Sequence, residues 1–224
     1  MKSKITTFLL TIVVIFTVFI TSCARNRDYV EAEVIDAAKS LIAKSARLNE
    51  IYWGEGIAHD QDKSGANGAY YRASAASLSR FGIATIDDLT RLTRETFTVD
   101  MANDIINNSL SSISDEDGIR IYARYYQKYS ALDDTPECIM VYDKAEVFLK
   151  DIVIYNYDTV RVSRVKGESI FVSIEVTVIN DEGKSQSSAL EVELIEEDAG
   201  FRLNSPTYKR YTDDDYYNEL QNKI

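Results

Sequence analysis

The chain has 224 residues, of which 36 are acidic and 25 are basic, and its formal net charge at pH 7 is −11. This acidic balance argues against a nucleic-acid partner and against charge-driven docking on anionic lipid head groups, because both are negatively charged. Hydrophobic residues make up 45% of the chain and charged residues 27%, which is typical of a globular protein and argues against long disordered stretches.

The N-terminus carries the pattern of an export signal. A basic start with Lys2 and Lys4 precedes an apolar stretch over residues 8–20, which is shorter than the roughly 20 residues of a transmembrane helix. The following Ile20-Thr21-Ser22-Cys23 resembles the lipobox of bacterial lipoproteins, whose cysteine receives a diacylglyceryl group. The resemblance implies that residues 1–22 are a lipoprotein signal peptide, that Cys23 is lipidated, and that residues 23–28 form a tether. The alternative is an ordinary signal sequence followed by a chance cysteine.

Lipidation of Cys23 would decide both location and redox chemistry. Two acyl chains on one residue are enough for stable anchoring, so we expect an extracytoplasmic protein held on a bacterial membrane. Cys138 would then be the only thiol left, because the chain contains two cysteines. An intrachain disulfide is therefore excluded, and the fold needs an apolar core of its own.

Helical periodicity governs the first part of the mature chain. Apolar residues at helical spacing predict a helix over residues 29–52, and the glycine-rich residues 53–71 are expected to form a loop. Residues 70–78 fit a helix or a strand equally well. Thr85 is a predicted N-cap with two aspartates in the first turn behind it, and Thr98 or Asp100 is predicted to cap a further helix.

The apolar period changes from 3.6 to 2 at residue 119. Strands are predicted over residues 119–126 and 139–142, and then over residues 159–166, 169–179, 188–196 and 201–203. Short turns join the last four strands, which is typical of an antiparallel meander. Residues 209–224 form an acidic, tyrosine-rich tail in which Thr212 could cap a short helix.

Helices followed by consecutive strands predict an α+β fold, in which N-terminal helices pack on one face of a curved C-terminal antiparallel β-meander. We expect one such domain over residues 29–208. The solvent-facing side of the meander should carry Glu175, Thr177, Glu191 and Glu193.

This order of elements resembles the cystatin-like folds, which include the nuclear-transport-factor-like group. The ending Gly200-Phe201-Arg202-Leu203-Asn204-Ser205-Pro206 is similar to the Gly-Trp-Arg-hydrophobic ending of secreted bacterial members, with Phe201 in place of Trp. More narrowly, Tyr70-Tyr71-Arg72, Ile86-Asp87-Asp88-Leu89-Thr90 and Glu95-Thr96-Phe97-Thr98 resemble segments of secreted inhibitors of cell-wall DL-endopeptidases. The first resemblance implies the fold, and the second implies inhibition of a peptidoglycan hydrolase.

No residue set predicts catalysis. His59 and Cys138 could form a nucleophilic pair, but neither lies in a recognised nucleophile motif, and Cys138 fits a small core residue. The single histidine also argues against a zinc site. We therefore predict a protein that is not an enzyme and has no cofactor.

One segment has the pattern of half a calcium loop. Asp60, Asp62 and Ser64 stand at the first, third and fifth positions, and Gly65 stands at the sixth. Tyr71 occupies the twelfth position, where a calcium loop has a bidentate Glu, so a metal site here is expected to be weak. The alternative is a polar turn.

The aromatic residues indicate a binding surface. Trp53 follows the first predicted helix, and Tyr122, Arg124 and Tyr126 alternate along a predicted strand, where exposed Tyr and Arg are typical of contact surfaces. The alternative is core packing for Trp53 and cross-strand packing for the others.

The sequence thus predicts a membrane-anchored lipoprotein that binds an envelope protein or another envelope ligand without catalysis. The alternatives are an inhibitor of a peptidoglycan DL-endopeptidase and a protein with a small-ligand pocket between helices and sheet.

Overall fold

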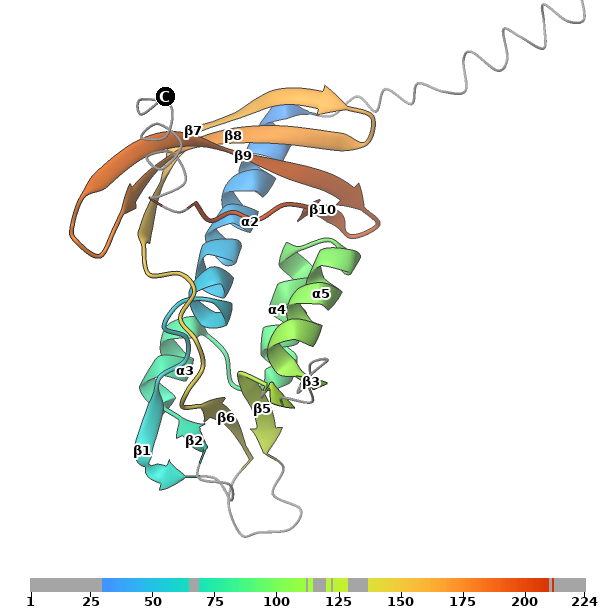
Figure 1. Cartoon of the computed structure of the whole chain (residues 1–224). Coiled ribbons are helices and arrows are strands. Elements are labelled where there is room, and N and C mark those ends of the chain that lie inside the picture. The colour runs from blue at the N-terminus through green and yellow to red at the C-terminus, as the bar shows by residue number, and fades with distance from the viewer. Residues whose placement is uncertain are drawn as a thin grey trace, which may run out of the picture.

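Two antiparallel sheets lie at opposite ends of a long helix, α2 (Figure 1). The computed structural model describes residues 30–64, 69–111, 113–114, 120–121, 123–128, 137–209 and 211, with the backbone alone for residues 61–64, 113–114 and 120–121. The helices are α2 (Glu31–Tyr52), α3 (Ala75–Phe81), α4 (Ile86–Thr96) and α5 (Val99–Leu110). The strands are β1 (His59–Ser64), β2 (Tyr70–Ala73), β3 (Ile113–Ser114), β4 (Arg120–Ile121), β5 (Tyr125–Lys128), β6 (Cys138–Tyr142), β7 (Ile152–Lys166), β8 (Ser169–Ile179), β9 (Ser185–Glu197) and β10 (Gly200–Leu203).

Helix α2 contacts the C-terminal sheet near its start and the small sheet region near its end. The helix buries one stripe, which includes Val34, Ala38, Leu41, Ile42 and Leu48. It contains no Gly or Pro, so both its propensity and its apolar spacing favour the helical state. The helix predicted over residues 29–52 is confirmed from Glu31 to Tyr52, and residue 29 lies outside the described residues.

The C-terminal sheet has the strand order β10-β9-β8-β7 and is the predicted meander. Val172 lies opposite Val192, and both side chains are fully buried on the face toward the helices. Glu175, Thr177, Glu191 and Glu193 lie on the opposite face and are exposed or half-buried, as expected. The architecture is therefore α+β, with N-terminal helices packed against a C-terminal antiparallel meander. Strand β7 begins at Ile152, well before the predicted start at residue 159. The prediction missed this first part because exposed isoleucines hide the alternation of polar and apolar residues there.

The small sheet has the order β1-β2-β6-β5 and differs from the prediction. Residues 53–71 were expected to be a loop, but they contain β1 and the first residues of β2. Strand β2 pairs with β6, so that Tyr71 lies opposite Val141, and β5 pairs with the other edge of β6. The ambiguous residues 70–78 divide at Ser74 into β2 and the start of α3. The β2–β6 pairing joins segments far apart in the chain, which local periodicity does not reveal, whereas β1–β2 and β5–β6 each pair consecutive strands.

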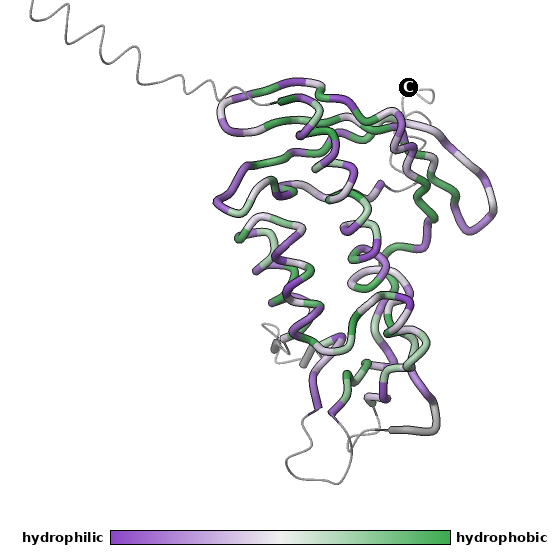
Figure 2. The backbone as a smooth tube through the Cα atoms, turned by 180° about the vertical axis from the view of Figure 1, so that it is seen from behind, coloured by the Kyte–Doolittle hydropathy of each residue, from purple (hydrophilic) through white to green (hydrophobic). Residues whose placement is uncertain are grey.

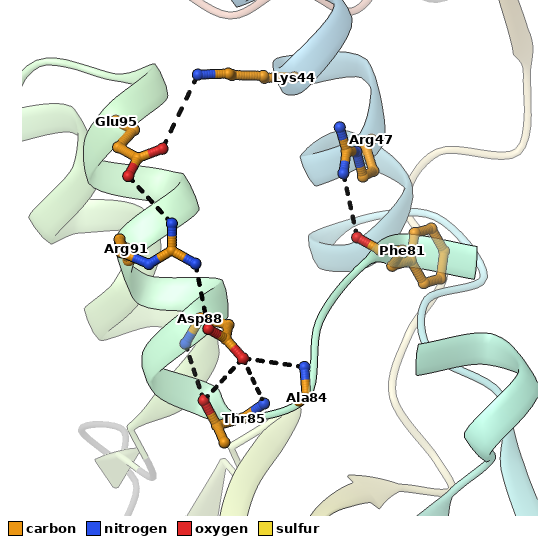
Figure 3. Close-up of polar contacts among 8 residues, drawn as sticks. All are labelled: Lys44, Arg47, Phe81, Ala84, Thr85, Asp88, Arg91 and Glu95. Carbon is orange, nitrogen blue, oxygen red and sulfur yellow. Dashed lines mark hydrogen bonds and ion pairs between the residues drawn. The ribbon is translucent and has the colours of Figure 1, made fainter. Parts of the chain in front are cut away.

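Helix α4 begins with a capping box (Figure 3). The Thr85 hydroxyl accepts a hydrogen bond from the Asp88 amide at 3.1 Å, and the Asp88 carboxylate accepts one from the Thr85 amide at 3.1 Å. This pair satisfies donors that a helix start leaves without partners, so the predicted cap is confirmed. Thr98 precedes α5, but its hydroxyl donates to Asn204 at 2.9 Å and ties α5 to the chain after β10.

One hydrophobic cluster joins both sheets and all four of these helices. Its members include Ile139 from β6, Ile174 from β8 and Leu48 from α2, each fully buried. Figure 2 shows apolar and polar residues alternating along the strands and helices that surround this cluster. The two sheets are therefore expected to unfold together.

Candidate functional site

The site is built at the C-terminal end of α2, where the last carbonyl groups of the helix need donors. Arg124 donates from its guanidinium to the carbonyls of Tyr52 and Gly54, and also to the carbonyl of Glu146 at 3.0 Å. The Tyr125 hydroxyl donates to the Ile51 carbonyl at 2.7 Å. A cation at a helix C-terminus also interacts favourably with the helix dipole. The end of α2 is thereby fixed against strand β5.

Gly56 allows this close approach. Its φ of 78° lies in the left-handed region, and an added Cβ would collide with the Tyr125 hydroxyl and the Arg124 guanidinium. Only glycine fits both the conformation and the space. Burial of the Tyr125 ring raises the pKa of its hydroxyl, so that this group stays a neutral hydrogen-bonding partner.

Trp53 follows α2 directly and has its ring between two tyrosines. The ring centroid lies 5.9 Å from that of Tyr52 and 5.8 Å from that of Tyr208. The Trp53 carbonyl accepts hydrogen bonds from the amides of Phe148 at 2.8 Å and Leu149 at 2.9 Å. The Trp53 side chain is half-buried and held in place, whereas its outer part is accessible.

Tyr208 belongs to a segment, residues 204–209, that crosses α2 after β10. Thr207 holds this segment in place. It is fully buried, its hydroxyl contacts Ser45, and the same hydroxyl accepts a hydrogen bond from the side-chain amide of Asn49 at 3.0 Å. The Tyr155 hydroxyl donates to the Thr207 carbonyl at 2.8 Å. Burial raises the pKa of the Tyr155 hydroxyl to about 12. Tyr208 is therefore placed against Trp53 by the buried polar contacts of the neighbouring Thr207.

Two clefts flank the Trp53–Tyr208 pair. The first, here called the α5 cleft, has a volume of about 250 Å³. It is lined by Asn49, Trp53, Phe97, Met101, Asp104, Ile105, Asn108, Ser109, Pro206 and Tyr208. Asp104 is the only charged residue among these lining residues, and its side chain is exposed.

The second, here called the β7 cleft, has a volume of about 440 Å³. It is lined by Ala46, Asn49, Glu50, Gly54, Glu55, Arg80, Leu149, Lys150, Asp151, Ile152, Val153, Tyr155 and Tyr208. Charges of both signs line it, and Arg80 forms an ion pair with Glu50. Tyr208 and Asn49 line both clefts, so the aromatic pair stands between two chemically different surfaces.

The strand predicted over residues 119–126 was expected to expose Tyr and Arg side chains, but its described side chains are buried or half-buried. Tyr125 is fully buried, and the Arg124 guanidinium is taken up by groups of its own chain. Tyr126 is half-buried and packs edge-on against Tyr70, with centroids 4.8 Å apart. Tyr122 lies outside the described residues. Arg124 and Tyr125 both secure the end of α2, so the Arg124 guanidinium has an internal role that the sequence did not predict. Partner contact by Tyr122, Arg124 and Tyr126 stays a prediction.

The segment predicted as a weak calcium loop is strand β1, which starts at His59 and includes Asp60, Asp62 and Ser64. An extended strand does not wrap its oxygens around an ion as a calcium loop does. The side chains of Asp62 and Ser64 lie outside the described set, so calcium binding stays a prediction. Among the described residues, no group of three His, Cys, Asp or Glu side chains is arranged to hold a metal ion.

His59 and Cys138 do not form a nucleophilic pair. They lie on β1 and β6, which β2 separates, so about 10 Å divides their backbones at a spacing of roughly 4.8 Å per strand. His59 instead contacts the Asp143 carboxylate at 3.2 Å and stacks on Tyr71. The Cys138 thiol contacts the Met140 sulfur.

Of the predicted contact residues, Trp53 alone lines one of these clefts. Sequence reasoning missed Tyr208, Asp104 and Asn49, which come from three separate segments. The only local signal was the aromatic character of residues 208–217.

Comparison with known proteins adds no relative: no family model matches the chain, and no curated protein matches it. Within the described part of the chain, no helix combines the length and hydrophobicity needed to cross a bilayer. The function of this protein is therefore inferred from the geometry of its own residues.

Proposed function

We propose that this protein is a non-enzymatic binding module, anchored outside the cytoplasmic membrane through a lipid on Cys23, and that its ligand site is the Trp53–Tyr208 pair with the two flanking clefts. One observation carries the proposal: a half-buried aromatic pair, Trp53 and Tyr208, lines the α5 cleft, and Tyr208 also lines the β7 cleft. Concave sites with apolar walls and a few convergent polar groups are the usual form of ligand sites.

The pair is prepared for binding before any ligand arrives. The backbone of Trp53 is fixed by the hydrogen bonds of its carbonyl, and the backbone of Tyr208 is held by the buried Thr207 beside it. The Trp53 ring packs against the rings of Tyr52 and Tyr208. A rigid aromatic pair loses little conformational entropy on binding, so more of the contact energy remains as affinity. Asn49 is buried against Thr207 at the boundary of both clefts and can also fix ligand orientation.

The anchor would limit how far this site lies from the bilayer. Residues 23–31 can span at most about 29 Å when fully extended, at 3.6 Å per residue. Helix α2 has 22 residues, so its length adds at most about 33 Å before the site at its C-terminal end. A ligand would therefore be an envelope component within about 60 Å of the membrane surface. A protein partner such as a peptidoglycan hydrolase belongs to the same proposal.

The single tryptophan of the chain makes the site observable, because intrinsic Trp emission reports on Trp53 alone. The full chain in detergent micelles would be titrated with muropeptides released by a muramidase and, separately, with a purified DL-endopeptidase. We expect a saturable change in Trp53 emission with one of them, abolished by Tyr208→Ala but retained in Tyr71→Ala, whose ring lies in the small sheet. Constant emission with both probes up to millimolar muropeptide would refute the proposed site.

Two further measurements separate the parts of the proposal. Cys23→Ala should move the protein from the membrane fraction to the soluble fraction, and unchanged membrane retention would remove the lipid anchor. If the endopeptidase also loses activity at near-equal molar ratio, the binding module is an inhibitor; full activity at excess protein would leave binding without inhibition.

A further inference from the structure

We infer that the α5 cleft binds an organic cation on an apolar stem, the chemistry of a lysine side chain; this inference deepens the proposed function and rests on it. The cleft joins two aromatic rings and one carboxylate in a small space. Trp53 and Tyr208 supply the rings, and Asp104 supplies the charge.

The sign of the charge follows from the lining. Aromatic ring faces carry a negative quadrupole potential and attract ammonium groups, Trp most strongly. The Asp104 carboxylate attracts a cation and repels an anion by the same Coulomb interaction. Among the described lining residues, no Lys, Arg or His opposes this preference. An anionic ligand would meet repulsion from the rings and from the carboxylate together.

The stem preference follows from the remaining walls. Phe97, Met101, Ile105 and Pro206 contribute apolar walls, and Ile105 is buried. Burying a four-carbon stem against such walls is favourable because it removes apolar surface from water. The volume of about 250 Å³ suits one side chain rather than a larger ligand.

The β7 cleft provides an internal contrast. Its lining includes Arg80 and Lys150 beside three carboxylates, so it offers no single-sign field to a cation. A lysine-like group should therefore enter on the α5 side of Tyr208. Selectivity between the clefts would arise from Asp104 and the absence of basic residues in the described lining of the α5 cleft.

The test uses the full chain in micelles and compares, by Trp53 emission, probes that share one backbone and differ in the charge of the side chain. The probes are Nα-acetyl-lysine methylamide, its neutral Nε-acetyl analogue, and the anionic Nα-acetyl-glutamate methylamide. The ammonium probe should bind about tenfold more tightly than the neutral analogue, since a partly desolvated cation–π contact with a nearby carboxylate stabilises by about 1–2 kcal/mol. The glutamate probe should not bind. A pentapeptide, Ala-Ala-Lys-Ala-Ala, distinguishes a lysine within a chain from a free amino-acid derivative, and tighter binding of the pentapeptide indicates a protein source.

Matched variants locate the effect. Asp104→Asn should weaken binding of the ammonium probe about fivefold, because one exposed carboxylate contributes about 1 kcal/mol. Asp181→Asn, at the tip of the β8–β9 turn, removes the same charge and should change affinity less than about twofold, because solvent screens distant charges. Unchanged melting temperatures would show that both variants fold.

Equal affinity for the ammonium and neutral probes, or an affinity unaffected by Asp104→Asn, would overturn the cation inference. If muropeptides or the endopeptidase still change Trp53 emission in that case, the proposed binding function stands without it. If none of these probes changes the emission, both fail.

Discussion

The two four-stranded sheets of this protein both contribute buried apolar residues to the core, but their strands pair in different ways. In the C-terminal sheet, each strand pairs with the next one along the chain, and the apolar face recurs at every second residue. In the small sheet, with the order β1-β2-β6-β5, two pairs of consecutive strands are joined by one long-range pairing, that of β2 with β6. Short-range pairing leaves its register in the local pattern, whereas long-range pairing depends on the rest of the fold.

The arginines of the two sheets show the same contrast. Arg164 of the C-terminal sheet lies on the exposed face, where it pairs with Glu191 at 2.7 Å and covers the Phe171 ring. Arg124, beside the small sheet, is half-buried and holds the carbonyl groups at the end of α2. An arginine thus forms a surface ion pair in the C-terminal sheet, whereas another arginine, beside the small sheet, stabilises the end of α2.

The largest expected effect tests whether the two sheets share one core. Ile139→Ala in the small sheet and Ile174→Ala in the C-terminal sheet should each lower the free energy of unfolding by about 3–4 kcal/mol, because both side chains are fully buried. Urea unfolding of each variant should remain a single transition. Ile154→Ala, at a side chain that is 53% exposed, serves as the control and should cost less than about 0.5 kcal/mol. A second transition in Ile139→Ala alone would show that the small sheet folds independently.

The two arginines give the next effect. Arg124→Met should lower the free energy of unfolding by about 2–3 kcal/mol, since carbonyls at the end of α2 lose a charged donor. Arg164→Met should cost less than about 1 kcal/mol, because exposed ion pairs contribute little. Chemical denaturation of both variants checks the difference. Equal losses would contradict the structural role given to Arg124.

The capping box predicts a smaller effect. Thr85→Ala removes the hydroxyl that accepts from the Asp88 amide and should cost about 1 kcal/mol of stability. Thr90→Ala, the same substitution one turn into α4, should be neutral or slightly stabilising because Ala has the higher helix propensity. Thermal melts compare them, and a Thr85→Ala melt equal to the wild-type melt would argue against the cap.

The smallest effect depends on pH. Hydrogen bonds from the Ala84 amide, the Arg91 guanidinium and Thr85 lower the pKa of Asp88 below 3.8 in the folded chain (Figure 3). The ionised form is therefore favoured by folding, and its contribution is complete above the unfolded pKa and lost as pH falls through the folded pKa. Asp88→Asn should cost less than about 1 kcal/mol at pH 7, because the group is exposed, and less still at pH 2, below the unfolded pKa. Urea titrations at both pH values measure this, and a pH-independent loss would exclude the charge as its cause.

The sequence was most informative where chemistry acts between near neighbours. The α2 stripe, the Thr85 cap and the alternation of β8 and β9 all involve residues a few positions apart, and the structure confirms each. The loop expected over residues 53–71 was wrong, because β1 pairs with β2, whose other edge pairs with β6 from a distant part of the chain. For the same reason, alternation along residues 119–126 did not reveal that Arg124 turns toward α2.

The sequence by itself determined the α+β class, the first helix and the meander, because periodicity of apolar residues selects helix or strand and the face that is buried. Tertiary structure alone decided the small sheet and the candidate site. Trp53, Asp104 and Tyr208 meet only because Thr207 fixes the last segment across α2 while Arg124 fixes the end of that helix from the other side. Contacts between distant segments depend on buried polar groups finding partners across the whole fold, and no local pattern encodes that outcome.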